Sequence, residues 1–183
     1  NIQRGQDFIN KLMEMYNRNT NNDKNEVAEK TREFINERIK IIDEELGTTE
    51  DKLEAFKRNA GLTDISSDAQ LAVSGNAEYE RKRVENGTQI NLVRDLNKYI
   101  NNPSNEYEVL PSNIGLSDNG LTTQIDRYNE LIIERKRLLR TSTESNPMIV
   151  NLDTSIRAMK ANVKAAIDGT LQGLLIVKAD LDR

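Results

Sequence analysis

Apolar residues recur three and four positions apart along most of the chain, the spacing that puts them on one face of an α-helix. The strictest stripe follows Glu26 and consists of Ile35, Ile39, Ile42, Leu46, Thr49, Leu53, Phe56 and Ala60. Such a heptad pattern predicts a helix that packs against another helix. Gly61 comes directly after the stripe, where a helix-terminating glycine is expected.

The same reading divides the whole chain into helices. We predict helices over about residues 4–22, 24–60, 67–101, 119–143 and 147–181, and a loop over 102–118. The polar stretch Asn19–Asn25 at the junction of the first two helices allows either a bend or a polar helix, and Gly47 is expected to kink or break the second. Asn101–Gly120 contains two prolines and two glycines with little periodicity, which is typical of a loop.

Each later helix has an apolar stripe of its own. In the helix over 67–101 the stripe is Val73, Ala77, Val84, Ile90, Val93, Leu96 and Ile100. After the loop it is Leu121, Ile125, Tyr128, Ile132, Arg135 and Leu139. The last stripe is Ile149, Leu152, Ile156, Met159, Val163, Ala166 and Thr170, continuing toward Val177.

Asn146 and Pro147 mark the turn between the last two helices, because they supply an N-cap followed by a first-turn proline. Two stripes joined by a short turn predict an antiparallel helical hairpin. We expect the last helix to pack against 121–139 and against 26–60. The fold class is therefore all-α, an elongated coiled-coil bundle of antiparallel hairpins formed by a single region, residues 1–183. The residues expected in its core include Ile39, Ile42, Leu46, Ile132, Leu139, Leu152, Ile156 and Met159.

Composition narrows the chemistry. The 183-residue chain has 31% charged residues, a mean hydropathy of -0.70, and neither His nor Cys. These absences remove the commonest general base and the thiolate, so we expect no catalytic residue, metal site or cofactor. The formal charge of -4 argues against a nucleic-acid surface. We interpret the two basic runs, Arg81–Arg83 and Arg135–Arg137, as solvated helix faces.

Three further patterns have little specificity. Asp43–Glu45 could suggest an acid and base pair, but successive helical residues point in different directions. Gly115–Thr122 has the glycine spacing of a phosphate-binding loop, yet Leu121 stands where that loop needs a lysine, so a turn is expected. The glycosylation sequon at Asn86 lies inside a predicted helix and is assigned no role.

Two segments resemble a known family. DKNEVAEKTREFINERIKIIDEELGTTEDKLEAFKRNAGL, residues 23–62, is similar to the helical extracytoplasmic region of bacterial polysaccharide co-polymerases, the chain-length determinants that often carry a tyrosine autokinase domain. YNELIIERKRLLRTSTESNPMIVNLDTSIRAMKANV, residues 128–163, resembles the returning hairpin of that region. The family's Walker motifs and tyrosine cluster are not visible, so no catalytic residue is carried over and this segment is expected not to be an enzyme.

The resemblance implies a function by architecture. Members of the family form rings in the inner membrane, project helices into the periplasm, regulate polymer length and couple synthesis to an outer-membrane export protein. By this likeness the chain is a periplasmic piece of a larger inner-membrane protein for capsular or exopolysaccharide export, with self-association and polysaccharide contact as expected interactions and a kinase domain elsewhere in the parent. A cytosolic coiled-coil scaffold or filament segment is the alternative. Because antiparallel helices cover most of their own stripes, the isolated chain is expected to be monomeric or weakly associated.

Overall fold

The protein consists of four α-helices and one short 3₁₀ helix in the part of the chain that the structure describes. The computed structural model describes the backbone of residues 2–60 and 67–183, and the side chains of residues 3–18, 20–44, 46 and 78–183. The helices are α1 (Ile2–Ala60), α2 (Ser67–Asn101), η1 (Pro103–Asn105), α3 (Asn119–Leu139) and α4 (Pro147–Leu181). No strand occurs in these residues, which confirms the all-α class.

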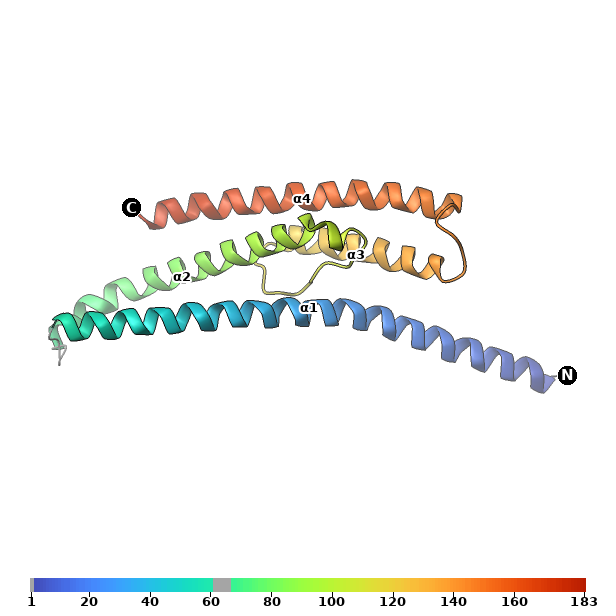
Figure 1. Ribbon diagram of the computed structural model, residues 1–183, viewed down its shortest axis with the longest axis horizontal. Helices are drawn as coiled ribbons and strands as arrows, with labels where there is room; N and C mark the ends of the chain where they lie inside the picture. The colour runs from blue at the N-terminus through green and yellow to red at the C-terminus, as the bar shows by residue number, and fades with distance from the viewer. Residues whose placement is uncertain (1, 61–66) are drawn as a thin grey trace.

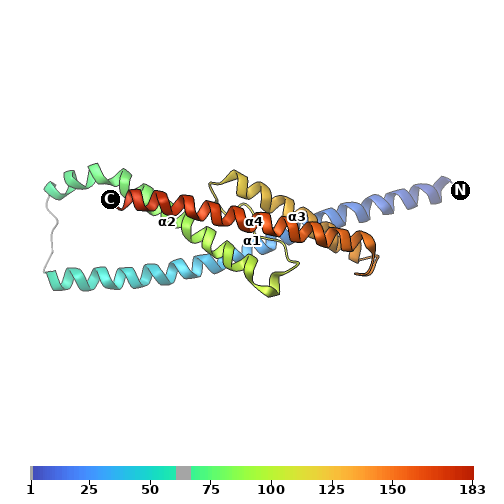
Figure 2. The ribbon, with the colours of Figure 1, turned by 90° about the horizontal axis from the view of Figure 1, so that it is seen from above.

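The helices form an elongated bundle in which α2 and α3 lie between α1 and α4 (Figure 1). α4 runs antiparallel to both α2 and α3, and it packs against both of them. α1 has 59 residues, so it is about 90 Å long at 1.5 Å per residue. Its N-terminal end projects past the bundle, and seen from above it crosses α2 at an angle (Figure 2).

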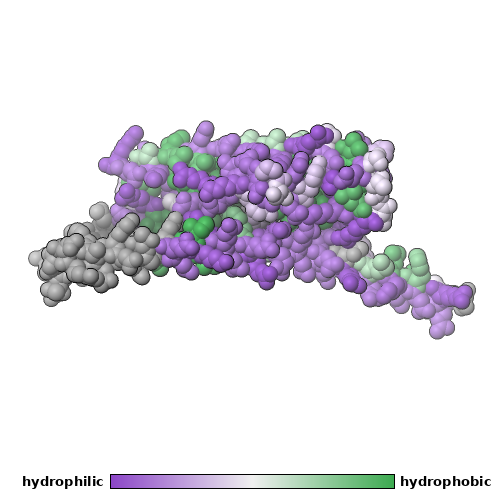
Figure 3. All heavy atoms as spheres, in the orientation of Figure 1, coloured by the Kyte–Doolittle hydropathy of each residue, from purple (hydrophilic) through white to green (hydrophobic). Residues whose placement is uncertain are grey.

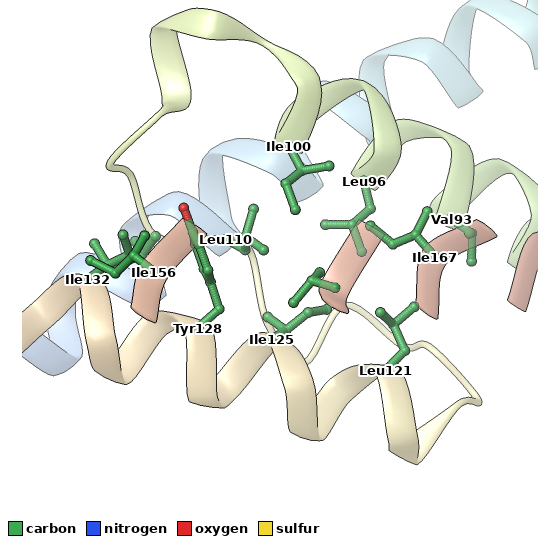
Figure 4. Packing of buried hydrophobic residues seen from close by; sticks show 12 residues of the cluster. Val93, Leu96, Ile100, Leu110, Leu121, Ile125, Tyr128, Ile132, Ile156 and Ile167 are labelled. Atoms are coloured by element: carbon green, nitrogen blue, oxygen red, sulfur yellow. The ribbon is translucent and has the colours of Figure 1, made fainter. Parts of the chain in front are cut away.

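The hydrophobic core lies where α2, α3 and α4 meet (Figure 4). Its fully buried members are Val93, Leu96, Ile100, Val109, Leu110, Leu121, Ile125, Tyr128, Ile132, Ile156, Val163 and Ile167. These residues come from α2, the loop before α3, α3 and α4. Among the side chains of α1 that the structure describes, none is a fully buried member, and Val27 alone packs against the cluster, half-buried. The core is therefore formed almost entirely by the later two thirds of the chain.

The loop after α2 is part of this core. Val109 and Leu110 belong to the buried cluster, and Pro111, Ser112 and Ile114 are buried as well. In Figure 1 the loop passes between α1 and the pair α2 and α3. The prediction of a loop over 102–118 is confirmed apart from the short η1, but its burial was not expected from its composition.

The boundaries differ from the sequence prediction in three places. α1 continues through Asn19–Asn25 and through Gly47, so the predicted separation and break are both wrong. The polar stretch stays helical because Asp23 is buried and paired with two arginines of α3, a tertiary interaction that outweighs weak propensity. α3 ends at Leu139 rather than 143. The expected end at Gly61 lies outside the described residues.

The heptad stripe of α1 does not pack as predicted. Ile39 is 49% exposed and Leu46 is 54% exposed, with Ile35 and Ile42 similarly accessible. The side chains of Thr49, Leu53, Phe56 and Ala60 lie outside the described residues. α4 packs against α2 and α3, so the expected packing of α4 on α1 is wrong within the described part of the chain. The strict heptad stripe predicts the buried face of α1, but α1 faces the bundle with another side.

The remaining stripes are mostly correct. Ile132 and Ile156 are buried, while Leu139, Leu152 and Met159 are half-buried. In α2 the stripe from Ile90 to Ile100 is buried, but Val84 is exposed, although Arg83 and Asn86 beside it bond to the C-terminal part of the chain. Near the end of α4 Val177 is exposed too.

Candidate functional site

The hairpin turn between α3 and α4 has the geometry that its sequence predicts. Asn146 is the N-cap of α4, with φ -63° and ψ 128°, and its Oδ1 accepts a hydrogen bond from the Met148 amide at 2.9 Å. Pro147 occupies the first helical turn, where no amide donor is needed. The Asn146 side chain also donates to Ser142 Oγ at 2.6 Å, which closes the turn on itself. The turn is thus built by local polar contacts.

Behind the turn, Arg135 joins the two helices of the hairpin. Its guanidinium donates to Asp153 of α4 and lies over the Tyr107 ring, 3.7 Å from the ring centroid. The hydrogen bond that Arg135 donates to Asp153 raises the pKa of Arg135 above its ordinary value. Arg135 stood at an apolar position of the α3 stripe, and its burial against Tyr107 shows that the stem packs like a hydrophobic residue.

The basic run Arg135–Arg137 is not a solvated face, which corrects the sequence interpretation. Its three side chains point in three directions: Arg135 to Asp153 of α4, Lys136 to Glu26 of α1 and Glu108 of the loop, and Arg137 to Asp23 of α1. Consecutive helical residues fan out around the axis, and here each direction meets a carboxylate. The run at Arg81–Arg83 is exposed, as predicted, although Arg83 pairs with Asp182.

The buried loop is fixed by side chains that hydrogen-bond to its backbone. Asn129 of α3 is buried, accepts from the Leu110 amide at 2.7 Å and donates to the Leu110 carbonyl at 2.8 Å. The Tyr99 hydroxyl donates to the Val109 carbonyl and the Tyr128 hydroxyl to the Glu106 carbonyl, each at 3.3 Å. Buried backbone groups need such partners because no helix or sheet supplies them. A polar residue beside a tyrosine in the α3 stripe was the signal that sequence reasoning missed.

α1 faces the bundle with Asp23, Val27, Thr31, Phe34 and Arg38. Asp23 is buried and accepts from Arg137 at 3.0 Å and from Arg140 at 3.1 Å. Thr31 Oγ1 donates to the Ser112 carbonyl and accepts from the Ser112 amide, and Arg38 donates to Asp95 of α2 at 2.8 Å. Most of these contacts are polar, which explains why hydrophobic periodicity did not identify this face.

The heptad stripe lies on a different side of α1. At about 100° per residue, Ile35, Ile39, Ile42 and Leu46 are centred roughly a quarter turn away from the bundle-facing side. A second exposed apolar group lies near the N-terminus, on the part of α1 that projects beyond the bundle. Around the helix axis it points roughly the same way as the bundle-facing side. Its members are Phe8, Ile9, Leu12, Met13, Met15 and Tyr16. In Figure 3 apolar surface is visible at this projecting end of α1.

Grooves accompany α1 on each side. One of about 560 Å³ lies between α1 and α3, lined by residues that include Val27, Ile133 and Arg137. Another of about 500 Å³ lies between α1 and the loop, near Ile35 and Ser112. A smaller one of about 240 Å³ separates α1 from α2. Between about residues 20 and 41, α1 is therefore attached by separate contacts rather than by continuous packing.

The other sequence candidates have structural roles. Asp118 N-caps α3 by accepting from the Leu121 amide, and its other oxygen accepts from Thr170, a contact that lowers the pKa of Asp118. Gly115–Asp118 is accordingly the turn before α3, with Gly115 at φ 85°, and Asn119–Thr122 is already helical. Asn86 of the sequon is buried and donates to the Leu174 carbonyl. Asp43 and Glu44 are exposed on α1, and the Glu45 side chain lies outside the described residues.

The described residues contain neither a candidate metal-binding cluster nor a candidate membrane-spanning helix. No group of three or more carboxylate, His or Cys side chains in this part of the chain is arranged to hold a metal ion. No described helix combines the length and the hydropathy that crossing a bilayer requires.

Comparison with known proteins gave no match to a protein-family model, to a curated protein or to a solved structure.

Proposed function

We propose that the chain is the periplasmic helical region of a bacterial inner-membrane polysaccharide co-polymerase, acting by assembly and reach rather than by catalysis. In this proposal copies associate into a ring, and the helices help to set the length of a capsular or exopolysaccharide and to meet an outer-membrane export protein. The support is the resemblance of residues 23–62 and 128–163, together with an elongated all-α architecture.

One observation carries the proposal: the bundle leaves exposed the four members of the α1 heptad stripe whose side chains the structure describes. Ile35, Ile39, Ile42 and Leu46 repeat at the spacing that suits a helical partner, whereas the stripes of α3 and α4 are largely buried within the chain. Because this stripe and the bundle-facing side are about a quarter turn apart, α1 can stay docked while the stripe meets a second copy. Assembly of copies is what a ring-forming protein needs.

The expectation that the isolated chain is monomeric or weakly associated assumes that antiparallel helices cover most of their own stripes. That premise fails for α1, since four large apolar side chains of its stripe are accessible.

The test uses the full-length parent protein in its bacterial host, with Ile39→Asp and Lys40→Asp as a matched pair. Ile39 lies on the stripe, whereas Lys40 is exposed on the third side of α1, away from both stripe and bundle. A charge buried in a helix pair is costly, so we expect Ile39→Asp to reduce crosslinked oligomer and to change polysaccharide length or amount at normal protein abundance. Lys40→Asp should resemble the wild-type protein.

Normal polysaccharide together with normal oligomer in the Ile39→Asp strain contradicts the assembly role of the stripe. A parent protein that fractionates with the cytosol and forms filaments contradicts the proposal and favours the coiled-coil scaffold.

A further inference from the structure

We propose that α1 is a detachable arm, held by an ionic clasp on a core that is complete without it. The clasp is defined by Asp23 of α1 with Arg137 and Arg140 of α3, and it is supported by the pairs Lys136–Glu26 and Arg38–Asp95. The inference concerns the chain itself and does not depend on the proposed function.

The hydrophobic core is composed almost entirely of residues outside α1. All fully buried members of the hydrophobic cluster belong to α2, the loop, α3 and α4, and Val27 is the only α1 side chain described against it. Undocking of α1 would expose Val27, Phe34 and the side of the loop and cluster that they cover, but the contacts among the cluster residues themselves do not involve the described side chains of α1. The labelled cluster residues lie on α2, the loop, α3 and α4 (Figure 4), so the two parts can separate while these contacts remain.

Mostly polar contacts hold the described part of α1 on the bundle. Along the described part of the helix, the links to the bundle are ion pairs and hydrogen bonds at Asp23, Glu26, Thr31 and Arg38, with apolar contact confined to Val27 and Phe34. Grooves of about 560, 500 and 240 Å³ lie between these links. Docking that depends on a few charge pairs is weaker and more sensitive to solution conditions than docking by a continuous apolar seam.

The arginine side of the clasp is accessible to solvent. The Asp23 side chain is only 8% exposed, but the side chains of Arg137 and Arg140 are 50% and 43% exposed. Mobile ions can reach the cationic side of the clasp, and the screening length falls from about 10 Å at 0.1 M salt to about 3 Å at 1 M. Salt should therefore weaken the attachment of α1 while leaving the apolar core, which salt does not weaken, in place.

The experiment measures the distance between α1 and α3 in the whole chain. Because the chain contains no cysteine, Asn25→Cys on α1 and Arg127→Cys on α3 give two unique spin-label sites. Both side chains are exposed. Pulsed electron resonance then reports the distance distribution at 0.05 M and 1 M sodium chloride, and circular dichroism reports helicity in the same samples.

The expected result is one narrow distance at low salt and a second, longer and broader population at 1 M salt, with helicity unchanged. Asp23→Asn should give that broad population already at low salt, because it removes the charge and keeps the size. Asp7→Asn is the matched control, since it makes the same change on the projecting end of α1, where Asp7 is exposed. It should behave as the wild-type chain.

Two outcomes overturn the proposal. A single narrow distance under all conditions, including Asp23→Asn at 1 M salt, means that the clasp does not control docking. A broad distance that appears only together with loss of helicity means that the core does not survive without α1.

Discussion

Polar residues on or directly beside the apolar stripe of α3 organise the centre of the molecule. Asn129 clamps the Leu110 backbone, Tyr128 closes the loop at Glu106, and Arg135 covers Tyr107 while it binds Asp153. The stripe itself was predicted from the sequence, including Arg135. The loop residues that these side chains contact were not predicted, because a loop with little periodicity gives no sign of where its backbone will lie.

Tyr128 supplies a prediction at the residue scale. Burial raises the pKa of Tyr128 to about 12, whereas an unfolded tyrosine titrates near about 10. Between these values the folded state keeps a proton that the unfolded state releases, so stability is present below pH 10 and falls as pH rises toward 12. The free energy of unfolding of the wild-type chain should decrease between pH 9 and pH 11. In Tyr128→Phe that decrease should be smaller by about 1 kcal/mol, measured by urea titration at the two pH values.

The control for this pH effect is Tyr16→Phe, which alters an exposed tyrosine on the projecting end of α1. It should lose stability between pH 9 and pH 11 by as much as the wild-type chain does. An equal loss in Tyr128→Phe would show that another group causes the pH dependence.

At the scale of elements, local signals were predicted more accurately than packing faces. The cap at Asn146 and the hairpin of α3 with α4 follow from neighbouring residues. The packing of α1 does not, because its bundle-facing side combines Asp23 and Arg38 with few apolar residues, while its best stripe faces outward. Hydrophobic periodicity identifies faces that avoid water, but it does not distinguish a partner within the chain from one outside it.

The cap of α4 gives a prediction at this scale. Asn146→Ala removes the acceptor for the Met148 amide, and loss of such a cap typically costs about 0.5 to 2 kcal/mol. We expect that decrease in the free energy of unfolding, measured by denaturant titration. Asn151→Ala, an exposed asparagine in the first turns of the same helix, should leave stability nearly unchanged. Equal effects of the two substitutions would show that the cap has no special weight.

The same turn can be tested for function under the proposed role. Asn146→Ala combined with Pro147→Gly in the full-length parent should fray the start of α4 and alter the amount or length of the surface polysaccharide. Normal polymer at normal protein abundance would leave the turn with a purely structural role.

At the scale of the whole molecule, the uneven distribution of the core predicts two units of different stability. A chain of residues 67–183 keeps every fully buried member of the hydrophobic cluster. We expect it to be helical and to unfold cooperatively, with circular dichroism during heating as the measurement. A gradual loss of helicity without a transition would show that α1 is needed for the core to form.

The position of α4 also determines how the molecule would carry a mechanical load. Its first half lies along α3, tied by Asp153, and its second half lies along α2, tied by Leu174, Asp180 and Asp182. α4 is thus a splint across two shorter overlaps. Tension between α2 and α3 along the long axis passes through α4 as shear, which loads many side-chain contacts at once instead of peeling them one by one. Stiffness of the extended bundle then depends on how long these overlaps are, and shortening α4 from its C-terminal end would soften the α2 side first.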